Sequence, residues 1–337
     1  MPNVLVTMGF DEQMLDRLRK VSPRLTVTRA DPEAADYSRV DVLYAGSPPR
    51  DLGRAPNLKW VQLHLAGVNV VYDHPLYKDT AIPLTTTSGV HAATIAEYAL
   101  AMVLALAHRV PTMLEWQAKG IWPPDDQRWP LFVPTELRGA TLGVIGYGSI
   151  GRELARLAKT ALAMTVLACK RDPSRRADDG YSPPGTGDPQ GAFPDEWLGP
   201  ERLGDLLRRS DVVVMCAPFT RETERMIGER ELAQMKATSY FVNVGRGATV
   251  DEAALARALR DQRIAGAAVD VFGDEPPPVG HPLYALAKDM GNVILSPHVS
   301  GFLASYDDKC SVLFAENLRR WLAGETLLNL VDRGKGY

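Results

Sequence analysis

The sequence predicts an α/β fold in which two domains each contain a parallel β-sheet. Short apolar runs with the length of strands alternate with stretches of helical periodicity, first from Asn3 and again from about Leu137. Such alternation is typical of parallel sheets whose strands are connected by helices. The 337 residues suffice for two domains with hydrophobic cores.

Predicted strands and one helix make up the N-terminal series. The helix spans Asp11–Lys20 and places Met14, Leu15 and Leu18 on one face. The strands are expected over Asn3–Thr7, Leu25–Thr28, Val40–Tyr44 and Trp60–Leu63. A turn over residues 64–69 follows the last of these strands.

A long apolar stretch separates the two series. We predict a helix from about Ala92 to Arg109, ended by Pro111, because proline disrupts helix interiors. It is apolar on nearly every face, so we expect it to be buried between domains or subunits. The segment Gly120–Pro134 is rich in proline and tryptophan and is not expected to form regular helix. It is either a linker or arm that reaches across a dimer, or a packed surface loop.

The second series opens on the motif G-x-G-x-x-G, between a predicted strand at Leu142–Ile145 and a stretch of helical periodicity. Its glycines allow a sharp turn, a close approach of the backbone to a pyrophosphate, and tight helix–strand packing. The helix N-terminus attracts phosphate. We therefore predict a Rossmann-type dinucleotide site; the alternative is a Gly-rich turn in another α/β protein. The residues expected to bind the cofactor here are Gly146, Gly148, Ser149, Ile150 and Gly151.

Further strands and helices complete the second series. The strands are expected over Thr165–Cys169, Asp211–Cys216, Tyr240–Val244, Ala267–Val271 and Val293–Ser296. The helices are expected over Arg202–Arg209, Glu229–Met235, Asp251–Leu259, where Asp251 is a suitable N-cap, and Tyr306–Leu322. The insert Asp172–Pro200 is expected to be a loop with no core of its own.

Composition and charge exclude several classes of function. The formal net charge is -3, which gives no indication of a nucleic-acid partner or of an anionic membrane. The N-terminus lacks the pattern of a signal peptide, and the longest apolar run is too short to span a bilayer. Cys169, Cys216 and Cys310 are scattered and odd in number, which argues against a disulfide framework, and no cluster indicates a metal. We expect a cytoplasmic protein.

Three ionisable residues are predicted to meet at one edge of the second sheet. Arg246, Glu275 and His298 each follow the carboxyl end of a predicted strand, where parallel sheets bind ligands. Arginine binds carboxylates through paired hydrogen bonds. Histidine donates protons near neutral pH, and an adjacent carboxylate stabilises its charged form and fixes its tautomer. Beside a nicotinamide that supplies hydride, the three suit reduction of a 2-oxo acid, although each residue alone has an ordinary structural alternative.

Four segments resemble the D-isomer-specific 2-hydroxyacid dehydrogenases, a family that includes glyoxylate/hydroxypyruvate reductases and D-3-phosphoglycerate dehydrogenases. They are GYGSIGRELA, FVNVGRGATVDEAAL, AAVDVFGDEPPP and ILSPHVSG, and their order extends the resemblance over Leu58–Trp321. It implies that hydride passes between NAD(P) and a small 2-oxo acid or D-2-hydroxy acid. It also implies that Arg246 binds the substrate and that Glu275 pairs with His298, the proton donor.

The resemblance implies roles for further residues. Leu65, Ala66 and Gly67 look like the family's loop that binds the substrate carboxylate. Asp270 would contact the nicotinamide amide. The other residues expected near the cofactor are Thr94, Cys216, Ala217, Pro218, Thr223, Val244 and Gly245.

The family's fold implies two Rossmann-like or flavodoxin-like domains with the active site in the cleft between them. Residues 1–98 and 299–337 would form the substrate domain, and residues 99–298 the dinucleotide-binding domain. A homodimer built through the cofactor domains is also implied, in keeping with the apolar helix and the Trp/Pro-rich segment.

One departure from the family bears on the cofactor. NAD-preferring members carry an acidic residue just after the second strand, where this chain has Lys170 followed by Arg171. A basic pair suits the 2′-phosphate of NADP, so we predict that NADP is favoured over NAD. Asp172 would still reach a ribose if the strand extended further.

Two alternatives remain at this stage. One is an NAD(P)-sensing, corepressor-like binding protein of the same fold. The other is a formate- or phosphite-oxidising relative, against which Glu275 argues, because formate enzymes carry glutamine there. The loops around Pro48, Leu65–Asn69 and Phe302 carry no charge that demands a phosphate, which disfavours phosphoglycerate as the substrate.

Overall fold

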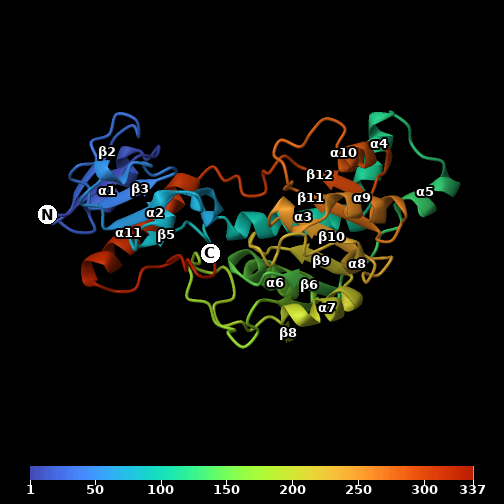
Figure 1. The fold of residues 1–337 in the computed structure, drawn as a ribbon. Coiled ribbons are helices and arrows are strands. Elements are labelled where there is room, and N and C mark those ends of the chain that lie inside the picture. The colour runs from blue at the N-terminus through green and yellow to red at the C-terminus, as the bar shows by residue number, and fades with distance from the viewer. Residues whose placement is uncertain (337) are drawn as a thin grey trace. The chain divides into compact units, whose positions relative to one another are not determined.

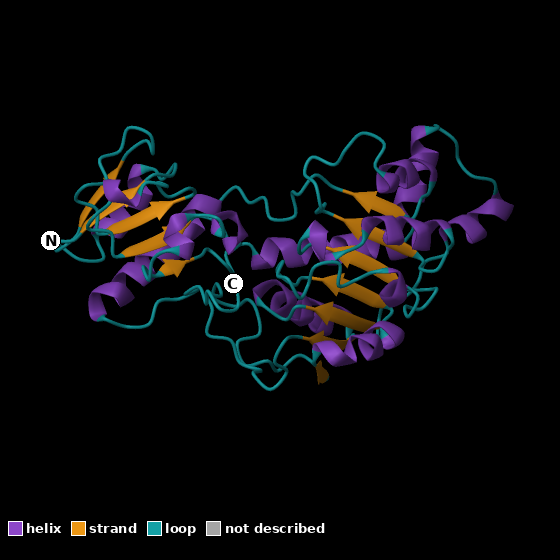
Figure 2. Cartoon of the chain, viewed as in Figure 1, coloured by secondary structure: helices purple, strands orange, loops and turns teal. Residues whose placement is uncertain are grey.

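The computed structural model describes residues 1–336, except for the side chain of Asp289, and the chain divides into two compact units. Unit 1 comprises Met1–His91, Asp179–Pro183 and the chain from Phe302 onward. Unit 2 comprises Ala92–Asp178 and Pro184–Gly301. Each unit contains one parallel sheet with helices packed on it (Figures 1 and 2).

The sheet of unit 1 has the strand order β2-β1-β3-β4-β5. Its strands are β1 (Asn3–Val6), β2 (Thr26–Arg29), β3 (Val42–Ala45), β4 (Trp60–Leu63) and β5 (Leu84–Thr85). The helices are α1 (Glu12–Arg19), α2 (Pro75–Lys78) and α11 (Tyr306–Ala323), and α1 packs against α11. Successive side chains of β1 enter different cores, since Val4 and Val6 pack with α1 and α11 while Leu5 lies in the core on the opposite face.

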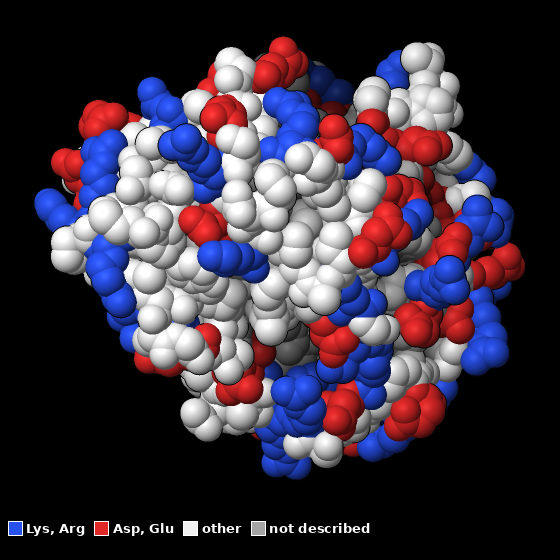
Figure 3. Space-filling model, turned by 60° about the vertical axis from the view of Figure 1, so that its left-hand side comes forward, with Lys and Arg blue, Asp and Glu red and all other residues white. Residues whose placement is uncertain are grey.

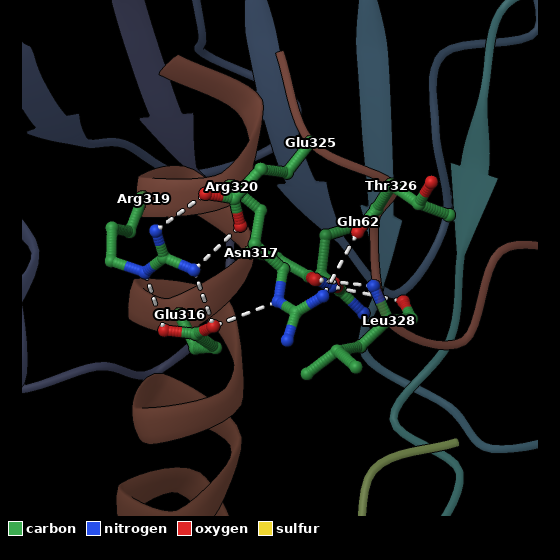
Figure 4. A network of polar contacts seen from close by, with 8 residues as sticks. All are labelled: Gln62, Glu316, Asn317, Arg319, Arg320, Glu325, Thr326 and Leu328. Carbon is green, nitrogen blue, oxygen red and sulfur yellow. Dashed lines mark hydrogen bonds and ion pairs between the residues drawn. The ribbon is translucent and has the colours of Figure 1, made fainter. Parts of the chain in front are cut away.

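A polar network joins α11 to the segment that follows it (Figure 4). The buried Asn317 amide donates to Gln62 Oε1 and to the Leu328 carbonyl, both at 3.1 Å, and its Oδ1 accepts from Leu328 N at 2.8 Å. On the exposed side, Arg319 bridges Glu316 and Glu325. The network holds the C-terminal segment against β4.

The sheet of unit 2 has the strand order β12-β11-β10-β9-β6-β7-β8. Its strands are β6 (Thr141–Ile145), β7 (Thr165–Cys169), β8 (Glu196–Leu198), β9 (Val212–Met215), β10 (Tyr240–Asn243), β11 (Gly266–Val269) and β12 (Val293–Leu295). The direction in which strands are added reverses beside β6, and this is the position at which doubly wound sheets bind ligands.

Helices cover both faces of the second sheet. On one face lie α3 (Ala92–Ala107) and α6 (Ser149–Leu162), which pack against each other. On the other face lie α7 (Leu203–Arg209), α8 (Glu229–Leu232), α9 (Glu252–Arg260) and α10 (Pro282–Asp289). Along β9, Val212 and Val214 face the first set, whereas Val213 and Met215 face the second. Burial on both faces explains why these strands are continuous apolar runs.

Two expectations about residues 92–134 are wrong. Pro111 does not end the long helix, because α3 stops at Ala107 and Pro111 instead lies in the first turn of α4 (Val110–Ala118), where a missing N–H costs nothing. The segment Gly120–Pro134 contains a helix after all, α5 (Asp125–Phe132). Asp125 and Asp126 favour its N-terminus, and Pro130 lies near its end, where few hydrogen bonds are lost.

The insert Asp172–Pro200 also differs from the expectation of a loop without a core. It contributes the edge strand β8, whose Leu198 is fully buried. Asp188 is buried too and accepts hydrogen bonds from the Tyr147 hydroxyl at 2.8 Å and from Phe193 N at 3.1 Å. The buried Arg152 of α6 donates to the carbonyls of Asp188 and Arg176. The insert is thus anchored on the residues of the Gly-rich motif and the first turns of α6.

No single helix within residues 1–336 combines the length and apolar character needed to cross a membrane. The consecutive helices α3 and α4 reach that length and apolar character only when taken together, and the chain bends by 68° between them.

Candidate active site

The loop between β6 and α6 has the geometry of a phosphate cradle. Gly146 has φ +94°, and a Cβ there would lie 2.5 Å from Ala217 N. A Cβ at Gly151 would lie 2.7 Å from the Gly146 carbonyl oxygen, so only glycine fits at either position. A Cβ at Gly148 would meet no atom within 4 Å, so its backbone is open to a ligand.

Helix α6 begins directly after this open backbone. Ser149 and Ile150 are its first residues, and its N-cap, Gly148, provides no side-chain acceptor for the first N–H groups. Such groups, together with the positive end of the helix dipole, bind phosphate. The residues present therefore fit the pyrophosphate of a dinucleotide.

The loops after β9 and β10 pack against each other. A Cβ at Gly245 would lie 2.8 Å from the Ala217 carbonyl oxygen. Thr223 Oγ1 donates to the Pro218 carbonyl at 2.7 Å and so fixes the loop after β9. Burial raises the pKa of the Cys216 thiol to about 12, so this thiol is neutral at physiological pH. Cys216, Ala217, Pro218, Val244 and Gly245 thus line neighbouring strand ends beside the Gly-rich loop, while Thr94 lies in the first turn of α3.

The basic pair after β7 is held by contacts within unit 2. The strand ends at Cys169, as the sequence predicts, and Lys170 Nζ donates to the Arg175 carbonyl at 2.6 Å. Burial lowers the pKa of Lys170. Arg171 forms an exposed ion pair with Glu222 at 3.3 Å. The carboxylate of Asp172 accepts hydrogen bonds from Ser174 N and Oγ, at 3.0 and 2.6 Å, so it caps its own turn.

Glu275 and His298 are in direct contact. Glu275 Oε2 lies 2.7 Å from His298 Nδ1, and Glu275 Oε1 accepts a hydrogen bond from Phe272 N at 3.0 Å. Both side chains are partly exposed, at 39% and 48%. With Nδ1 turned toward the carboxylate, Nε2 is the ring nitrogen left for exchange of a proton with a substrate.

Arg246 lies on a loop that packs against the loop of Glu275. A Cβ at Gly247 would lie 1.9 Å from the carbonyl carbon of Phe272, so the residue after Arg246 has to be glycine. Asn243, which the sequence did not single out, fixes this loop: its Oδ1 accepts from Gly245 N at 3.1 Å and its amide donates to the Arg246 carbonyl at 3.2 Å. Its position at the end of a strand, just before the glycines, was the available signal.

Asp270 is fully buried and organises the segment that carries His298. Its carboxylate accepts hydrogen bonds from Val299 N at 2.9 Å, from Ser300 N at 3.0 Å and from the Ser296 hydroxyl. Its carbonyl accepts from His298 N at 2.8 Å. The Tyr98 hydroxyl of α3 bonds to Ser296 Oγ, another contact that the sequence pattern did not indicate.

The loop Leu65–Gly67 follows β4 in unit 1. The preceding carbonyl, that of His64, accepts from Thr87 Oγ1 at 3.0 Å and from the Tyr306 hydroxyl at 2.5 Å. Burial lowers the pKa of His64, whose Nδ1 lies 2.8 Å from the Tyr44 hydroxyl. In its neutral form the His64 ring accepts a hydrogen bond from the Tyr44 hydroxyl at Nδ1 and directs its Nε2–H toward Asp307, 3.4 Å away. The start of the loop is therefore rigidly held.

Comparison with known proteins places this geometry in a family. Residues 100–300 match the NAD-binding domain of the D-isomer specific 2-hydroxyacid dehydrogenases. The glyoxylate reductase of Aeropyrum pernix is 36% identical over 286 residues, which cover 84% of this chain and 78% of that protein. The glyoxylate reductase of Thermococcus gammatolerans is 32% identical over 348 residues, covering 98% and 96%.

Solved structures agree over the whole chain. A D-isomer specific 2-hydroxyacid dehydrogenase from Xanthobacter autotrophicus, in complex with NADPH and MES, superimposes with a TM-score of 0.79 at 30% identity and covers 100% of this chain and 99% of its own. An NADPH-dependent glyoxylate/hydroxypyruvate reductase from Sinorhizobium meliloti, with NADP and malonate, gives 0.69 at 27% identity, covering 99% and 98%. The chain therefore belongs to the D-isomer-specific 2-hydroxyacid dehydrogenases and is an oxidoreductase that transfers hydride between NAD(P) and 2-oxo or 2-hydroxy acids.

Proposed function

We propose that this protein reduces a small 2-oxo acid, of the glyoxylate or hydroxypyruvate type, to the D-2-hydroxy acid. The bound nicotinamide supplies the hydride, and His298 Nε2 donates the proton to the substrate oxygen. The observation that carries the proposal is the 2.7 Å contact between Glu275 and His298 Nδ1, which fixes the direction of the ring and leaves Nε2 to act. In the oxidative direction, the same nitrogen accepts the proton.

Arg246 is the proposed ligand of the substrate carboxylate. Guanidinium groups bind carboxylates in a planar, two-point geometry, which would orient the 2-oxo group toward both His298 and the hydride donor. The packing of Gly247 on Phe272 supports this role, because it keeps the arginine loop next to the loop of Glu275. The assignment of Leu65, Ala66 and Gly67 to substrate binding, and of residues 1–98 and 299–337 to the substrate domain, stays a prediction.

We propose NADP as the favoured cofactor. Lys170 directly after β7 supports this preference, since an acidic residue at that position would bond the ribose hydroxyls of NAD and repel a 2′-phosphate. The Xanthobacter relative was solved with NADPH, and the Sinorhizobium relative is described as NADPH-dependent. Among the substrates, glyoxylate is favoured by the names of the relatives from Aeropyrum and Thermococcus.

We also propose a cytoplasmic homodimer. Large apolar side chains are exposed on and between α4 and α5, which is unusual for a free surface. They are Met113, Leu114, Ile121, Trp122 and Trp129. On the face shown in Figure 3, both acidic and basic side chains occur across the surface.

The test of the activity is a comparison of initial rates. NADPH and NADH oxidation are measured side by side with glyoxylate, hydroxypyruvate, pyruvate and phenylpyruvate. The configuration of the products of the last three acids is determined by chiral chromatography, since glycolate, the product of glyoxylate, is achiral. We expect the fastest loss of NADPH with glyoxylate or hydroxypyruvate. Tight cofactor binding without turnover of any of these acids would contradict the proposal and would fit a protein that senses the nucleotide.

A further inference from the structure

A second carboxylate–histidine pair lies next to the loop that carries Glu275. Glu252 is the first residue of α9, and its Oε2 lies 2.8 Å from His281 Nε2. These side chains are 20% and 9% exposed, so the pair is considerably more buried than Glu275 and His298. His281 Nδ1 has no hydrogen-bond partner within residues 1–336, so Glu252 provides the polar contact of this ring.

Glu252 also binds the backbone of the loop. Its Oε1 accepts a hydrogen bond from Gly273 N at 2.7 Å, two residues before Glu275. The neighbouring Phe272 donates its N–H to Glu275, and its ring meets the His281 ring edge-on, with centroids 5.5 Å apart. The turn over residues 272–275 is thus held by one carboxylate from α9 and by the histidine that the carboxylate fixes.

We propose that Glu252 and His281 are positioning residues that fix the 272–275 turn, so that Glu275 presents Oε2 to His298 Nδ1. This inference rests on the proton-donor role of His298 in the proposed function. Loss of the Glu252 carboxylate would free Gly273 N and leave His281 without its acceptor. Glu275 would then lose its fixed orientation, although no group assigned to the substrate or the cofactor had been removed.

Two other charged groups near His298 have to be considered in such a variant. Asp270 accepts from His298 N through its carbonyl at 2.8 Å, and its carboxylate is held by residues 296–300, none of which Glu252 contacts. Arg246 lies on the loop whose Gly247 packs on Phe272 of the same turn, so release of the turn would reach this loop as well. A change in the KM for the 2-oxo acid would report on Arg246, whereas the double variant described below isolates the part of the kcat effect that acts through Glu275.

The first test compares three variants of the whole protein. Glu252→Ala is expected to lower kcat for 2-oxo acid reduction by roughly 10- to 100-fold, because small misplacements of catalytic groups cost up to about 10²-fold. The Kd for NADPH is expected to stay unchanged. Glu252→Gln keeps an acceptor for Gly273 N and is expected to retain most of the activity. Arg257→Ala is the matched control: it lies on α9 like Glu252, removes only an exposed ion pair with Glu229 of α8, and should behave as wild type.

A double-variant cycle separates positioning from a general structural role. If Glu252 acts through Glu275, then Glu252→Ala added to Glu275→Gln lowers kcat no further. A full additional loss in the double variant would overturn the proposal. His281→Gln serves as a second route if thermal unfolding shows that Glu252→Ala does not fold, with the same expectation in the Glu275→Gln background.

A readout without turnover keeps the two proposals distinguishable. In a crystal structure of Glu252→Ala without substrate, Glu275 Oε2 is expected to lie beyond hydrogen-bond distance of His298 Nδ1, compared with 2.7 Å here. Absence of any 2-oxo acid reduction by the wild type would contradict the proposed function and leave this measurement valid. An unchanged contact between Glu275 and His298 in Glu252→Ala would show that Glu252 does not position Glu275.

Discussion

At the scale of single residues, His298 combines an exposed ring with a constrained backbone. Its φ is +53°, a left-handed conformation that costs a non-glycine residue about 1–2 kcal/mol. The hydrogen bonds from His298 N, Val299 N and Ser300 N to Asp270 hold the chain in this conformation. Backbone strain of this kind is concentrated at functional sites, where it fixes the direction of a side chain.

His298→Ala is expected to lower kcat by roughly 10²–10⁴-fold, the usual contribution of a positioned general acid. The Kd for the cofactor should stay unchanged, because the Gly-rich loop is elsewhere on the sheet edge. Steady-state kinetics together with fluorescence titration of NADPH measure the two quantities. A near-normal kcat would remove the proton-donor role.

Glu275→Ala is expected to lower kcat by roughly 10- to 100-fold. His298 Nδ1 would lose the carboxylate 2.7 Å away, which fixes the tautomer and the direction of the ring. Steady-state kinetics of both proteins is the measurement, and a kcat equal to that of the wild type would show that the two residues are not coupled.

The sequence was sufficient to predict the contact between Glu275 and His298 but not what supports it. Arg246, Glu275 and His298 follow strand ends, and parallel topology alone brings strand ends to one edge. Tyr98 and the Glu252–His281 pair act through contacts between segments far apart in the chain, whereas Asn243 acts within its own loop. No local pattern distinguishes Tyr98, Glu252 and His281 from ordinary polar side chains before the fold is known.

At the scale of elements, strands were predicted more successfully than the helices of residues 110–132. The central strands of unit 2, such as β9 and β10, are buried on both faces, so they are continuous apolar runs with clear ends. Helix α5 has an exposed tryptophan and an internal proline, and neither α4 nor α5 buries a residue fully. Because neither helix packs an apolar face against the core, the sequence indicates them only through the residues at their ends, and such residues predict a helix weakly.

The end of β7 provides a test of cofactor preference. Lys170→Asp combined with Arg171→Ala is expected to lower the ratio of kcat/KM for NADPH to that for NADH. The new carboxylate would bond the ribose hydroxyls of NADH and repel the 2′-phosphate of NADPH. Measurement with both cofactors is its own control, because a general loss of folded protein lowers both values equally. An unchanged ratio would show that residue 170 does not face the ribose.

The network at the end of α11 predicts a local stability effect. Asn317→Ala would leave the partly buried Leu328 N and carbonyl without their side-chain partner, and we expect the free energy of unfolding to fall by about 1–3 kcal/mol. Arg319→Ala removes only the exposed bridge of the same helix and should change stability little. Urea denaturation gives the free energy of unfolding of both variants. Equal losses in the two variants would contradict a special contribution of the buried Asn317 amide.

At the scale of the whole molecule, the exposed apolar side chains of α4 and α5 provide the basis for the proposed homodimer. Trp122 and Trp129 are 79% and 77% exposed in the single chain. Clustered exposed apolar side chains, unlike single scattered ones, mark interaction surfaces. A second copy of this chain would cover them, and tryptophans often contribute most of the binding energy of such interfaces.

Trp122→Glu combined with Trp129→Glu is therefore expected to convert a dimer to a monomer, because each carboxylate would have to be buried without a partner in the interface. Sedimentation velocity at micromolar concentration measures the change. Val279→Glu is the control, since Val279 is fully exposed and lies outside α4 and α5, on the loop before α10. A wild-type monomer, or a dimer that survives both substitutions, would mean that this surface does not join two subunits.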